Sequence, residues 1–283
     1  MTLEELQAGI VIPIDKPRQW TSFQVVSKVK SAIRHAFDLK KIKIGHAGTL
    51  DPLATGLLLV CVGKSTKNIP LLQEGIKVYS GTMVIGATTP CHDMEQAIDH
   101  FYPFEHITPE AIEQARRQFE GDISQMPPMF SAVKIDGQRA YQIARQAANS
   151  QIEKAQESED SGEPAPQPTP KTIHIDKFEI TAFRPGTQLD THPQETTNRA
   201  AEPLQRFLYD HPQGSIPGHL PQIDFRITCG KGTYIRSIAR DFGIALGSGA
   251  FLASLRREQV GDYTIQQAYP LKLLAETFFN QQS

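Results

Sequence analysis

The segment IDFRITC (223–229) alternates apolar and polar residues without interruption. Successive side chains of a strand point to opposite faces, so this pattern predicts a strand with one buried and one accessible face. A second segment, VYSGTMVIGATT (78–89), also predicts a strand, with Gly81 and Gly86 as expected bulge points. The two segments therefore predict that the fold contains β-strands, one of them with a single buried face.

Two segments carry strong signals for the start of a helix. Thr21 and Gln24 form a T-x-x-Q capping box ahead of apolar residues at helical spacing, so residues 22–37 predict an amphipathic helix. In ITPEAIEQARRQFEG, Thr108 is the predicted N-cap and Pro109 occupies the first helical position. These signals predict that helices accompany the sheet.

The order of the predicted elements indicates the fold class. The apolar run LLLVCVG (57–63) is compatible with a buried strand or a short buried helix, and the sequence leaves both open. Strands and helices are mixed without strict βαβ alternation, which favours an α+β arrangement around a mostly antiparallel sheet flanked by helices. We expect one catalytic domain over residues 1–283, with flexible surface insertions at 150–170 and 184–222.

Basic residues gather in two parts of a chain whose formal net charge is only −2. Residues 27–67 hold eight Lys and Arg against two acids, and residues 226–257 hold six against one. Two such segments are what a polyanion-binding face requires. A solvated surface with chance clustering is the alternative, and composition does not decide between them.

Several classes of protein are disfavoured by what the sequence lacks. No run of eighteen apolar residues predicts a membrane span, and the first residues do not resemble a signal peptide. The three cysteines (Cys61, Cys91 and Cys229) are far apart and form no CxxC, which fits a reducing cytoplasm better than a disulfide framework. No histidine completes a metal-ligand spacing, so a structural zinc site is not expected.

The glycine-rich stretch GHAGTLDP holds His46 and Asp51 between basic and apolar segments. An Asp-Pro turn whose carboxylate accepts local amide hydrogen bonds is the ordinary reading. A phosphate-binding loop ending in Gly63-Lys64-Ser65 is disfavoured, because position 58 is leucine where that motif needs glycine. The later segment GKGTYIRSIARD offers an arginine that could balance the charge of Asp51.

GHAGTLDPLATGLL closely resembles the catalytic motif of the tRNA pseudouridine synthase B family. Four further blocks resemble that family's motifs in the same order, over roughly residues 9 to 262: IDKPRQWTS, KVYSGTMVIGATT, QMPPMFSAVKIDGQRAYQIAR, and CGKGTYIRSIARDFG followed by LRR. Five blocks in order are far more specific than one glycine loop. The resemblance implies the pseudouridine synthase fold, with the active site in a cleft across the sheet.

The resemblance also implies roles for individual residues. Asp51 matches the essential aspartate, Tyr79 the tyrosine that stacks on the target base, and Arg236 the arginine that pairs with the carboxylate. The resemblance implies that RNA or the base pocket is contacted by His46, Tyr234 and Leu255. Two lysines, Lys64 and Lys67, are predicted to flank the site. The implied partner is the T stem-loop of tRNA, at the uridine numbered 55 by convention.

Isomerisation of uridine to pseudouridine is neither a redox reaction nor a group transfer to a second molecule, so no cofactor is expected. A carboxylate can act in it as a nucleophile or as a base, and the sequence does not choose between these routes. A guanidinium favours the charged form of a nearby carboxylate, so we expect Arg236 to keep Asp51 ionised and oriented. The target base must leave its stack before Asp51 can reach it.

The sequence departs from the family pattern after the K-x-Y strand, in the longer connections at 150–170 and 184–222, and near its end. TTPCHDMEQ replaces the usual T-D-T-x-D-x-x-G, so that Asp93 is the one acid kept at the later position. About twenty residues follow the last motif, too few for the C-terminal PUA-type RNA-binding domain of many bacterial members. We expect a cytoplasmic monomer that does not associate with membranes. An RNA-binding or tRNA-folding chaperone without catalysis, and a synthase acting on another RNA, are the alternatives.

Overall fold

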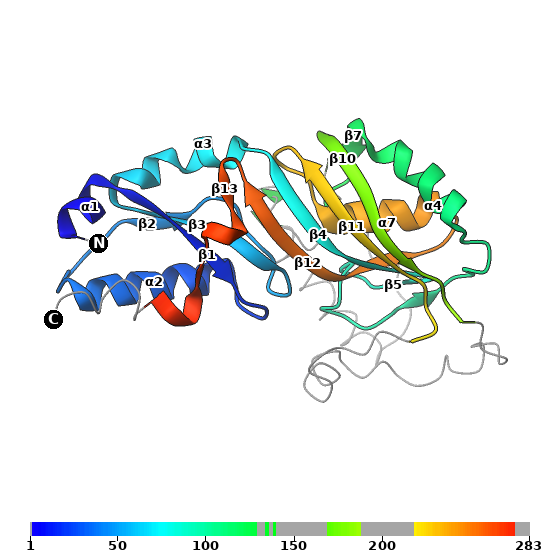
Figure 1. Ribbon diagram of the computed structural model, residues 1–283, viewed down its shortest axis with the longest axis horizontal. Helices are drawn as coiled ribbons and strands as arrows, with labels where there is room; N and C mark the ends of the chain where they lie inside the picture. Colours follow the sequence, from blue (N-terminus) through cyan, green and yellow to red (C-terminus); the bar gives the residue numbers. More distant parts are fainter. Residues whose placement is uncertain (1, 129–133, 136–137, 140–168, 188–217, 275–283) are drawn as a thin grey trace.

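The computed structural model describes residues 2–128, 134–135, 138–139, 169–187 and 218–274 (Figure 1). A ten-stranded sheet runs through them in the order β14-β1-β3-β12-β4-β11-β10-β7, with β2 paired to β3 and β13 to β12. Its strands are β1 (Ile10–Lys16), β2 (Ile44–His46), β3 (Thr55–Val62), β4 (Lys77–Ile85), β7 (Gly121–Gln125), β10 (Lys171–Arg184), β11 (Gln222–Cys229), β12 (Ala250–Val260), β13 (Tyr263–Thr264) and β14 (Tyr269–Pro270). The pairs are antiparallel except β1 with β14 and β3 with β12, which confirms the predicted mostly antiparallel sheet.

Shorter elements surround the sheet. Two small hairpins pair β5 (Ala87–Thr88) with β6 (His100–Phe101) and β8 (Lys134–Ile135) with β9 (Gln138–Arg139). The α-helices are α1 (Leu3–Ala8), α2 (Ser22–Ala36), α3 (Ile69–Glu74), α4 (Pro109–Arg116) and α7 (Ile235–Ala245). Short 3-10 turns are η1 (Gly63–Asn68), η2 (Arg117–Phe119), η4 (Ile265–Gln267) and η5 (Leu271–Leu273). None of the helices in the described ranges is long and apolar enough to cross a membrane.

Strand β3 is buried on both faces, which explains its continuous apolar sequence. Leu58, Val60 and Val62 pack against α2, while Leu57 and Leu59 pack in a second cluster that includes residues of α3. A strand covered on both sides needs no polar residues at alternate positions. The ambiguity left by the sequence is therefore resolved in favour of a strand.

Helix α2 begins where the capping box predicts. The Thr21 side chain accepts a hydrogen bond from the Gln24 amide, and the Gln24 side chain accepts one from the Thr21 amide at 2.7 Å. The buried face of α2 carries Val25, Val29 and Ile33, so its packing against β1 and β3 follows from the helical spacing of the apolar residues. Thr108 caps α4 as predicted, and Pro109 is the first residue of that helix.

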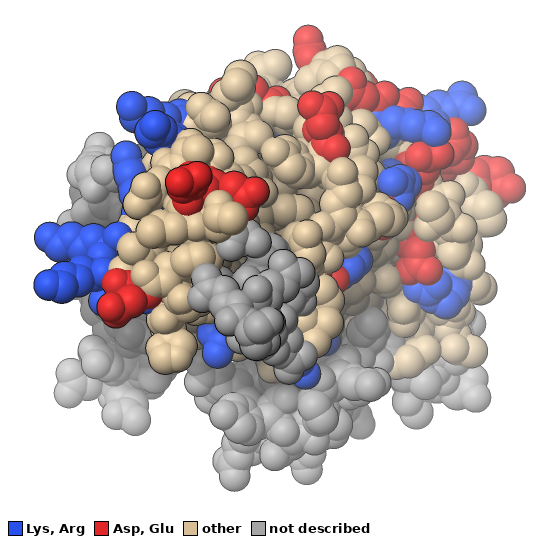
Figure 2. All heavy atoms as spheres, turned by 60° about the vertical axis from the view of Figure 1, so that its left-hand side comes forward, with Lys and Arg blue, Asp and Glu red and all other residues tan. Residues whose placement is uncertain are grey.

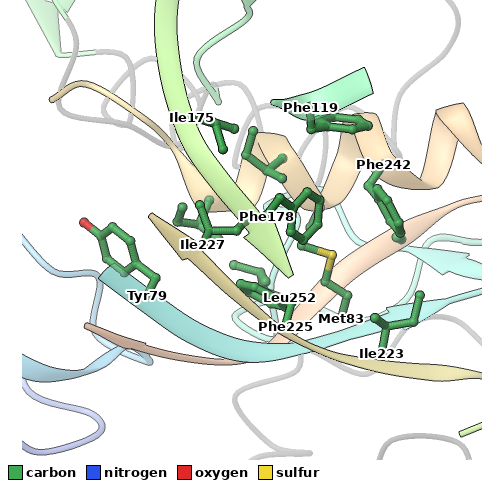
Figure 3. Close-up of a cluster of buried hydrophobic side chains, with 14 of the residues drawn as sticks. Tyr79, Met83, Phe119, Ile175, Phe178, Ile223, Phe225, Ile227, Phe242 and Leu252 are labelled. Atoms are coloured by element: carbon green, nitrogen blue, oxygen red, sulfur yellow. The ribbon is translucent and has the colours of Figure 1, made fainter. Parts of the chain in front are cut away.

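Helices α4 and α7 cover one face of the other half of the sheet. Phe119, Phe178, Phe225 and Phe242 meet there edge to face (Figure 3), with ring centroids of the Phe178–Phe242 pair 5.4 Å apart. Such contacts add about 0.5–1.5 kcal/mol per pair to the burial of the rings. This cluster fixes α7 against β11 and β12, and α7 carries Arg236.

The prediction of a bulge at Gly81 is wrong. The register between β4 and β12 shifts twice, and each time the extra residue lies on β12, at Ala253 and at Glu258. A Cβ on Gly81 would lie 2.3 Å from the carbonyl oxygen of Ser254, so glycine instead allows the two strands to approach. Gly86, with φ of 93°, separates β4 from β5.

The predicted insertions lie largely outside the described residues. Only residues 169–170 of the first are described, and residues 184–187 and 218–222 of the second. Arg184 ends β10 and Gln222 begins β11, so the second predicted insertion connects two strands that are neighbours in the sheet.

Candidate active site

The loop that carries Asp51 connects β2 to β3 and is held by the start of α2. The Ser22 hydroxyl donates to the Leu50 carbonyl at 3.1 Å and accepts from the Leu50 amide at 2.9 Å. The Gln19 amide donates to the Pro52 carbonyl at 2.8 Å. The backbone groups of Leu50 and Pro52, the two neighbours of Asp51 in the sequence, are therefore fixed by hydrogen bonds. The Asp51 side chain remains 39% exposed.

Arg257 holds the same loop from the other side. This buried arginine lies on β12 directly before the extra residue Glu258. It donates from Nε to the Leu57 carbonyl at 2.8 Å and from Nη2 to the Gly48 carbonyl at 3.0 Å. Gly56 has φ of 100°, and a Cβ there would lie 2.3 Å from the Arg257 carbonyl oxygen. Glycine at position 56 is thus required by the close contact between β3 and β12.

Asp51 forms an ion pair with Arg236, as the sequence analysis predicted. Arg236 Nε lies 3.0 Å from Asp51 Oδ2, and the Arg236 side chain is only 6% exposed. Arg236 NH1 also donates to the Cys91 carbonyl at 3.2 Å. The guanidinium is therefore fixed on two sides, and it leaves the exposed edge of the Asp51 carboxylate facing solvent.

A second carboxylate, Asp93, approaches the same guanidinium. Its Oδ2 lies 3.7 Å from Arg236 Nε, and its side chain is buried. Burial raises the pKa of Asp93, and the charge of Arg236 opposes that rise. Arg236 lies in the first turn of α7, where the helix dipole favours anions and disfavours cations. The negative charges of Asp51 and Asp93 offset the unfavourable interaction of Arg236 with the helix dipole.

Lys16 supplies another cation beneath the loop. Its buried Nζ donates to the carbonyls of Pro17 at 3.0 Å, Trp20 at 2.5 Å and Pro52 at 3.2 Å. Burial lowers the pKa of Lys16 to about 8, and the charge of Asp51 partly offsets this effect. Lys16 belongs to the IDKP motif, and Arg257 belongs to the LRR motif and to the basic segment 226–257. The two motifs were the one signal that could have singled out these residues.

Tyr79 and Leu255 lie on adjacent strands at the edge of the large core cluster. Tyr79 is 9% exposed, and Figure 3 shows its hydroxyl turned away from the other labelled side chains. Tyr79 pairs with Arg257 across β4 and β12, and Leu255 pairs with Gly81 two positions along. Burial raises the pKa of the Tyr79 hydroxyl, an effect opposed by the charge of Arg257. Tyr79 is therefore a neutral ring at neutral pH.

His46 and Tyr234 occupy the ends of two elements near the loop. His46 ends β2, and burial, followed by the charge of Arg257, lowers the pKa of its ring, so the imidazole is neutral. Tyr234 is the N-cap of α7. Its amide donates to Gln125 Oε1 at 2.8 Å and its carbonyl accepts from Gln125 Nε2 at 3.1 Å, which fixes the start of the helix that carries Arg236.

Comparison with known proteins places this chain in a family. Residues 34–192 match the family model described as TruB family pseudouridylate synthase (N terminal domain). The chain is 44% identical to a tRNA pseudouridine synthase B of Flavobacterium johnsoniae, over 98% of this chain and 99% of that protein. It is 39% identical to the protein of the same name from Phocaeicola vulgatus, over 97% of this chain and 95% of that protein.

The chain belongs to the TruB family of pseudouridylate synthases. Among solved structures, it resembles a chain of the Cbf5-Nop10-Gar1 complex, with a TM-score of 0.58 and 24% sequence identity. It also resembles a chain of the archaeal box H/ACA sRNP Nop10-Cbf5 complex, with a TM-score of 0.54 and 23% identity. These matches cover 98% of this chain and 56% of each solved chain, and at this identity they show a shared fold.

Two lysines that the sequence analysis placed beside the site lie elsewhere in this TruB-family chain. Lys64 and Lys67 are exposed on η1, which follows the end of β3. Asp51 precedes the beginning of that eight-residue strand, so the lysines lie roughly 20 Å or more along β3 from the loop. They line a hollow of about 340 Å³ together with Lys41, Lys43 and apolar residues of α1. The prediction that they flank the site is therefore wrong, although both remain on the basic end of the molecule.

Within the part of the chain that the structure describes, no group of three or more His, Cys, Asp or Glu side chains is arranged to bind an ion. The candidate site is built from one ion pair, one further carboxylate, and two buried cations that fix the loop backbone.

The turn that replaces the usual family sequence after β5 supports Asp93 firmly. The Thr89 hydroxyl donates to the Asp93 carbonyl at 2.6 Å, and the Leu252 amide donates to the His92 carbonyl at 3.0 Å. His92 adopts φ of 59°, which side chains with a Cβ rarely do. This conformation at residue 92 lets the Cys91 carbonyl and the Asp93 carboxylate both face Arg236.

We expect His92→Gly to keep turnover within about threefold of the parent, because glycine adopts positive φ without strain. His92→Val should lower turnover by about tenfold or more, because a β-branched residue in this region costs about 1–3 kcal/mol and displaces both groups from Arg236. The measurement is the initial rate of pseudouridine formation in unmodified tRNA. Equal losses in the two variants would show that the imidazole matters and the backbone conformation does not.

Proposed function

We propose that this chain converts uridine to pseudouridine in the T loop of tRNA, at position 55, with Asp51 as the catalytic carboxylate. The observation that carries the proposal is the Asp51–Arg236 pair, in which a buried guanidinium orients a carboxylate that remains accessible from solvent. Relatives named tRNA pseudouridine synthase B, similar over nearly the whole chain, support tRNA as the substrate.

The chemistry explains why one carboxylate is enough. The bond between N1 of the base and C1′ of the ribose breaks, and a bond between C5 and C1′ forms. The C5 proton leaves and N1 gains a proton, so the product is an isomer of the substrate. No electrons are transferred and no group is carried away, so the reaction itself calls for no cofactor. Asp51 can serve as a nucleophile at the base or the sugar, or as a base at the sugar.

The surrounding residues fit the steps before and after bond breakage. The target uridine must leave its stack, at a cost of a few kcal/mol. The Tyr79 ring, at the edge of the core, can stack on the flipped base and regain roughly 1–3 kcal/mol. Neutral His46, together with Tyr234 and Leu255, would contact the RNA or line the base pocket, while Lys64 and Lys67 would bind more distant phosphates. We further infer that the chain acts as a cytoplasmic monomer with one catalytic domain.

The test is to incubate the protein with an unmodified tRNA transcript and to map pseudouridine at single-nucleotide resolution. A transcript with cytidine at position 55 is the control, because it preserves the tRNA and removes only the target. Product at position 55 of the first transcript and none in the second is the expected result. Tight binding of both transcripts without any product would support a tRNA-binding protein without catalysis. Product at other positions would indicate a different substrate site.

Arg236→Lys should lower kcat by about a hundredfold with little change in KM. Lysine lacks the planar fork, so its single nitrogen cannot occupy both the position of Nε beside Asp51 and that of Nη1 beside the Cys91 carbonyl. A catalytic group misplaced in this way costs about that much. Steady-state kinetics on tRNA transcripts provides both parameters. Full activity in this variant, with Asp51 intact, would show that the pairing does not orient the carboxylate.

A further inference from the structure

Helix α2 presents a large aromatic side chain to solvent beside the catalytic loop. Phe23 is 75% exposed, although burying a phenylalanine normally stabilises a fold. The residue before it, Ser22, binds both the carbonyl and the amide of Leu50 through its hydroxyl, and Leu50 precedes Asp51. Phe23 therefore directly follows the residue that holds the backbone next to the candidate catalytic Asp51.

Two cations continue from Phe23 along one flank of α2. Each residue of an α-helix turns by about 100°, so positions separated by seven and eleven residues return to nearly the same side. Lys30 and Arg34 stand at these two spacings from Phe23, and both are exposed. Lys28 is also exposed but is turned about 160° away from Lys30, on the opposite flank. Neither Lys28 nor Lys30 forms a salt bridge with any acid in the described ranges.

The hand of the β1–α2–β2 connection decides which flank faces the site. Strands β1 and β2 are both antiparallel to β3 and lie on its two sides, so α2 connects parallel strands. Such crossovers are right-handed in about 98% of cases. With this hand, the flank of Phe23, Lys30 and Arg34 lies toward β2, and the flank of Lys28 lies toward β14. A hydrogen bond of 3.1 Å from Arg34 Nε to the carbonyl of Leu39, in the segment that leads to β2, agrees with this placement.

The flank therefore borders the strand that ends at His46 and leads into the Asp51 loop. Figure 2, which turns the α1 and α2 end of the molecule forward, shows Lys and Arg atoms gathered at the left edge, whereas acidic and basic atoms are mixed at the upper right. An exposed aromatic followed by cations matches the chemistry of a nucleic-acid strand, which offers base faces for stacking and phosphates for charge.

We propose that this surface, the α2 flank (Phe23, Lys30 and Arg34), binds the tRNA substrate next to the target nucleotide. Phe23 stacks on a base or ribose adjacent to the flipped uridine, and Lys30 and Arg34 bind phosphates of the strand that continues from it. The proposal rests on the proposed function, because it takes tRNA as the partner. It assigns to α2 a role in positioning the substrate beyond its role as a support for the Asp51 loop.

Lys28 provides a matched control for the charge part of the proposal. The dissociation constant of catalytically inactive Asp51→Asn protein for a labelled T stem-loop RNA is measured from 50 to 300 mM salt, alone and combined with Lys30→Ala or Lys28→Ala. Lys30→Ala should weaken binding about three- to tenfold and reduce the slope of log Kd against log salt by about 0.7–0.9, the loss of one phosphate contact. Lys28→Ala should change neither quantity. Equal effects of the two substitutions would overturn the proposal, since they differ only in the flank.

Phe23→Ala and Phe23→Tyr test the stacking part. In protein with Asp51 intact, Phe23→Ala should raise KM for tRNA about tenfold, within the range of one base–aromatic stack, and Phe23→Tyr should restore it. Ile244→Ala, at a 66% exposed apolar residue of α7, is the control and should leave KM unchanged. An unchanged KM in Phe23→Ala would contradict the proposal that Phe23 stacks on the RNA. Absence of product in the parent protein would count against the proposed function, whereas the salt titration would still decide whether the α2 flank binds RNA.

Discussion

Asp51→Asn is expected to reduce pseudouridine formation by a thousandfold or more while leaving tRNA binding within about threefold of the parent. Asparagine has the shape of aspartate but neither its charge nor its basicity, so it can act neither as a nucleophile nor as a base. The loop should keep its conformation, because it is anchored by hydrogen bonds from the side chains of Ser22, Lys16 and Arg257 to its backbone carbonyls. Single-turnover rates and dissociation constants measured on the same RNA separate the two effects.

Asp176→Asn is a suitable control, because its side chain is 40% exposed, close to the 39% of Asp51, but lies on β10 away from the loop. This variant should turn over at the parental rate. Parental turnover in Asp51→Asn would remove Asp51 from the chemistry. A loss of binding equal to the loss of turnover would assign it to substrate recognition instead.

Gly56→Ala is expected to destabilise the protein by more than 4 kcal/mol and to lower Tm by roughly 10 °C or more. The added Cβ would lie 2.3 Å from the Arg257 carbonyl oxygen and 2.8 Å from its amide nitrogen, so β3 and β12 would have to separate. That separation would also disturb the arginine that holds the Asp51 loop. Thermal unfolding followed by circular dichroism measures the shift.

Gly121→Ala distinguishes the clash from the backbone strain. Gly121 has φ of 85°, comparable to the 100° of Gly56, but a Cβ there would have no atom within 4 Å. Strain alone costs about 1–2 kcal/mol per residue, which predicts a shift of only a few degrees. If the two variants unfold at the same temperature, positive φ explains the requirement for glycine at position 56 and the contact with Arg257 does not.

Elements whose signal is local could be predicted from the sequence. The capping box gives the start of α2, and strict alternation gives β11 together with its buried face. Resemblance to the family predicted the pairing of Asp51 with Arg236, 185 positions apart, which local patterns could not have supplied. The sequence could not assign β3 as a strand, because its continuous apolar run reflects burial of both faces. One face packs against α2, and the other packs in the cluster that includes residues of α3.

What the sequence could not show depends on register and burial. The sequence alone does not distinguish Lys16 and Arg257 from charged residues of the surface, yet both are buried and donate to backbone carbonyls. The extra residues on β12 at Ala253 and Glu258 decide which side chains of that strand face inward, and no local pattern marks them. Lys64 seemed close to the site because few residues separate it from the loop, but those residues form an extended strand.

The anchoring of the loop by Arg257 has a consequence for the order of folding during synthesis. Asp51 leaves the ribosome early, but Arg236 and Arg257 emerge about two hundred residues later. Domains form as their segments become available, and contacts between distant segments form slowly. The loop can therefore be anchored by α2 soon after it is made, whereas its ion pair and its second anchor must await α7 and β12. A nascent chain without β12 carries the catalytic motif but no assembled site, so catalytic competence arises late, when β12 inserts between β3 and β4.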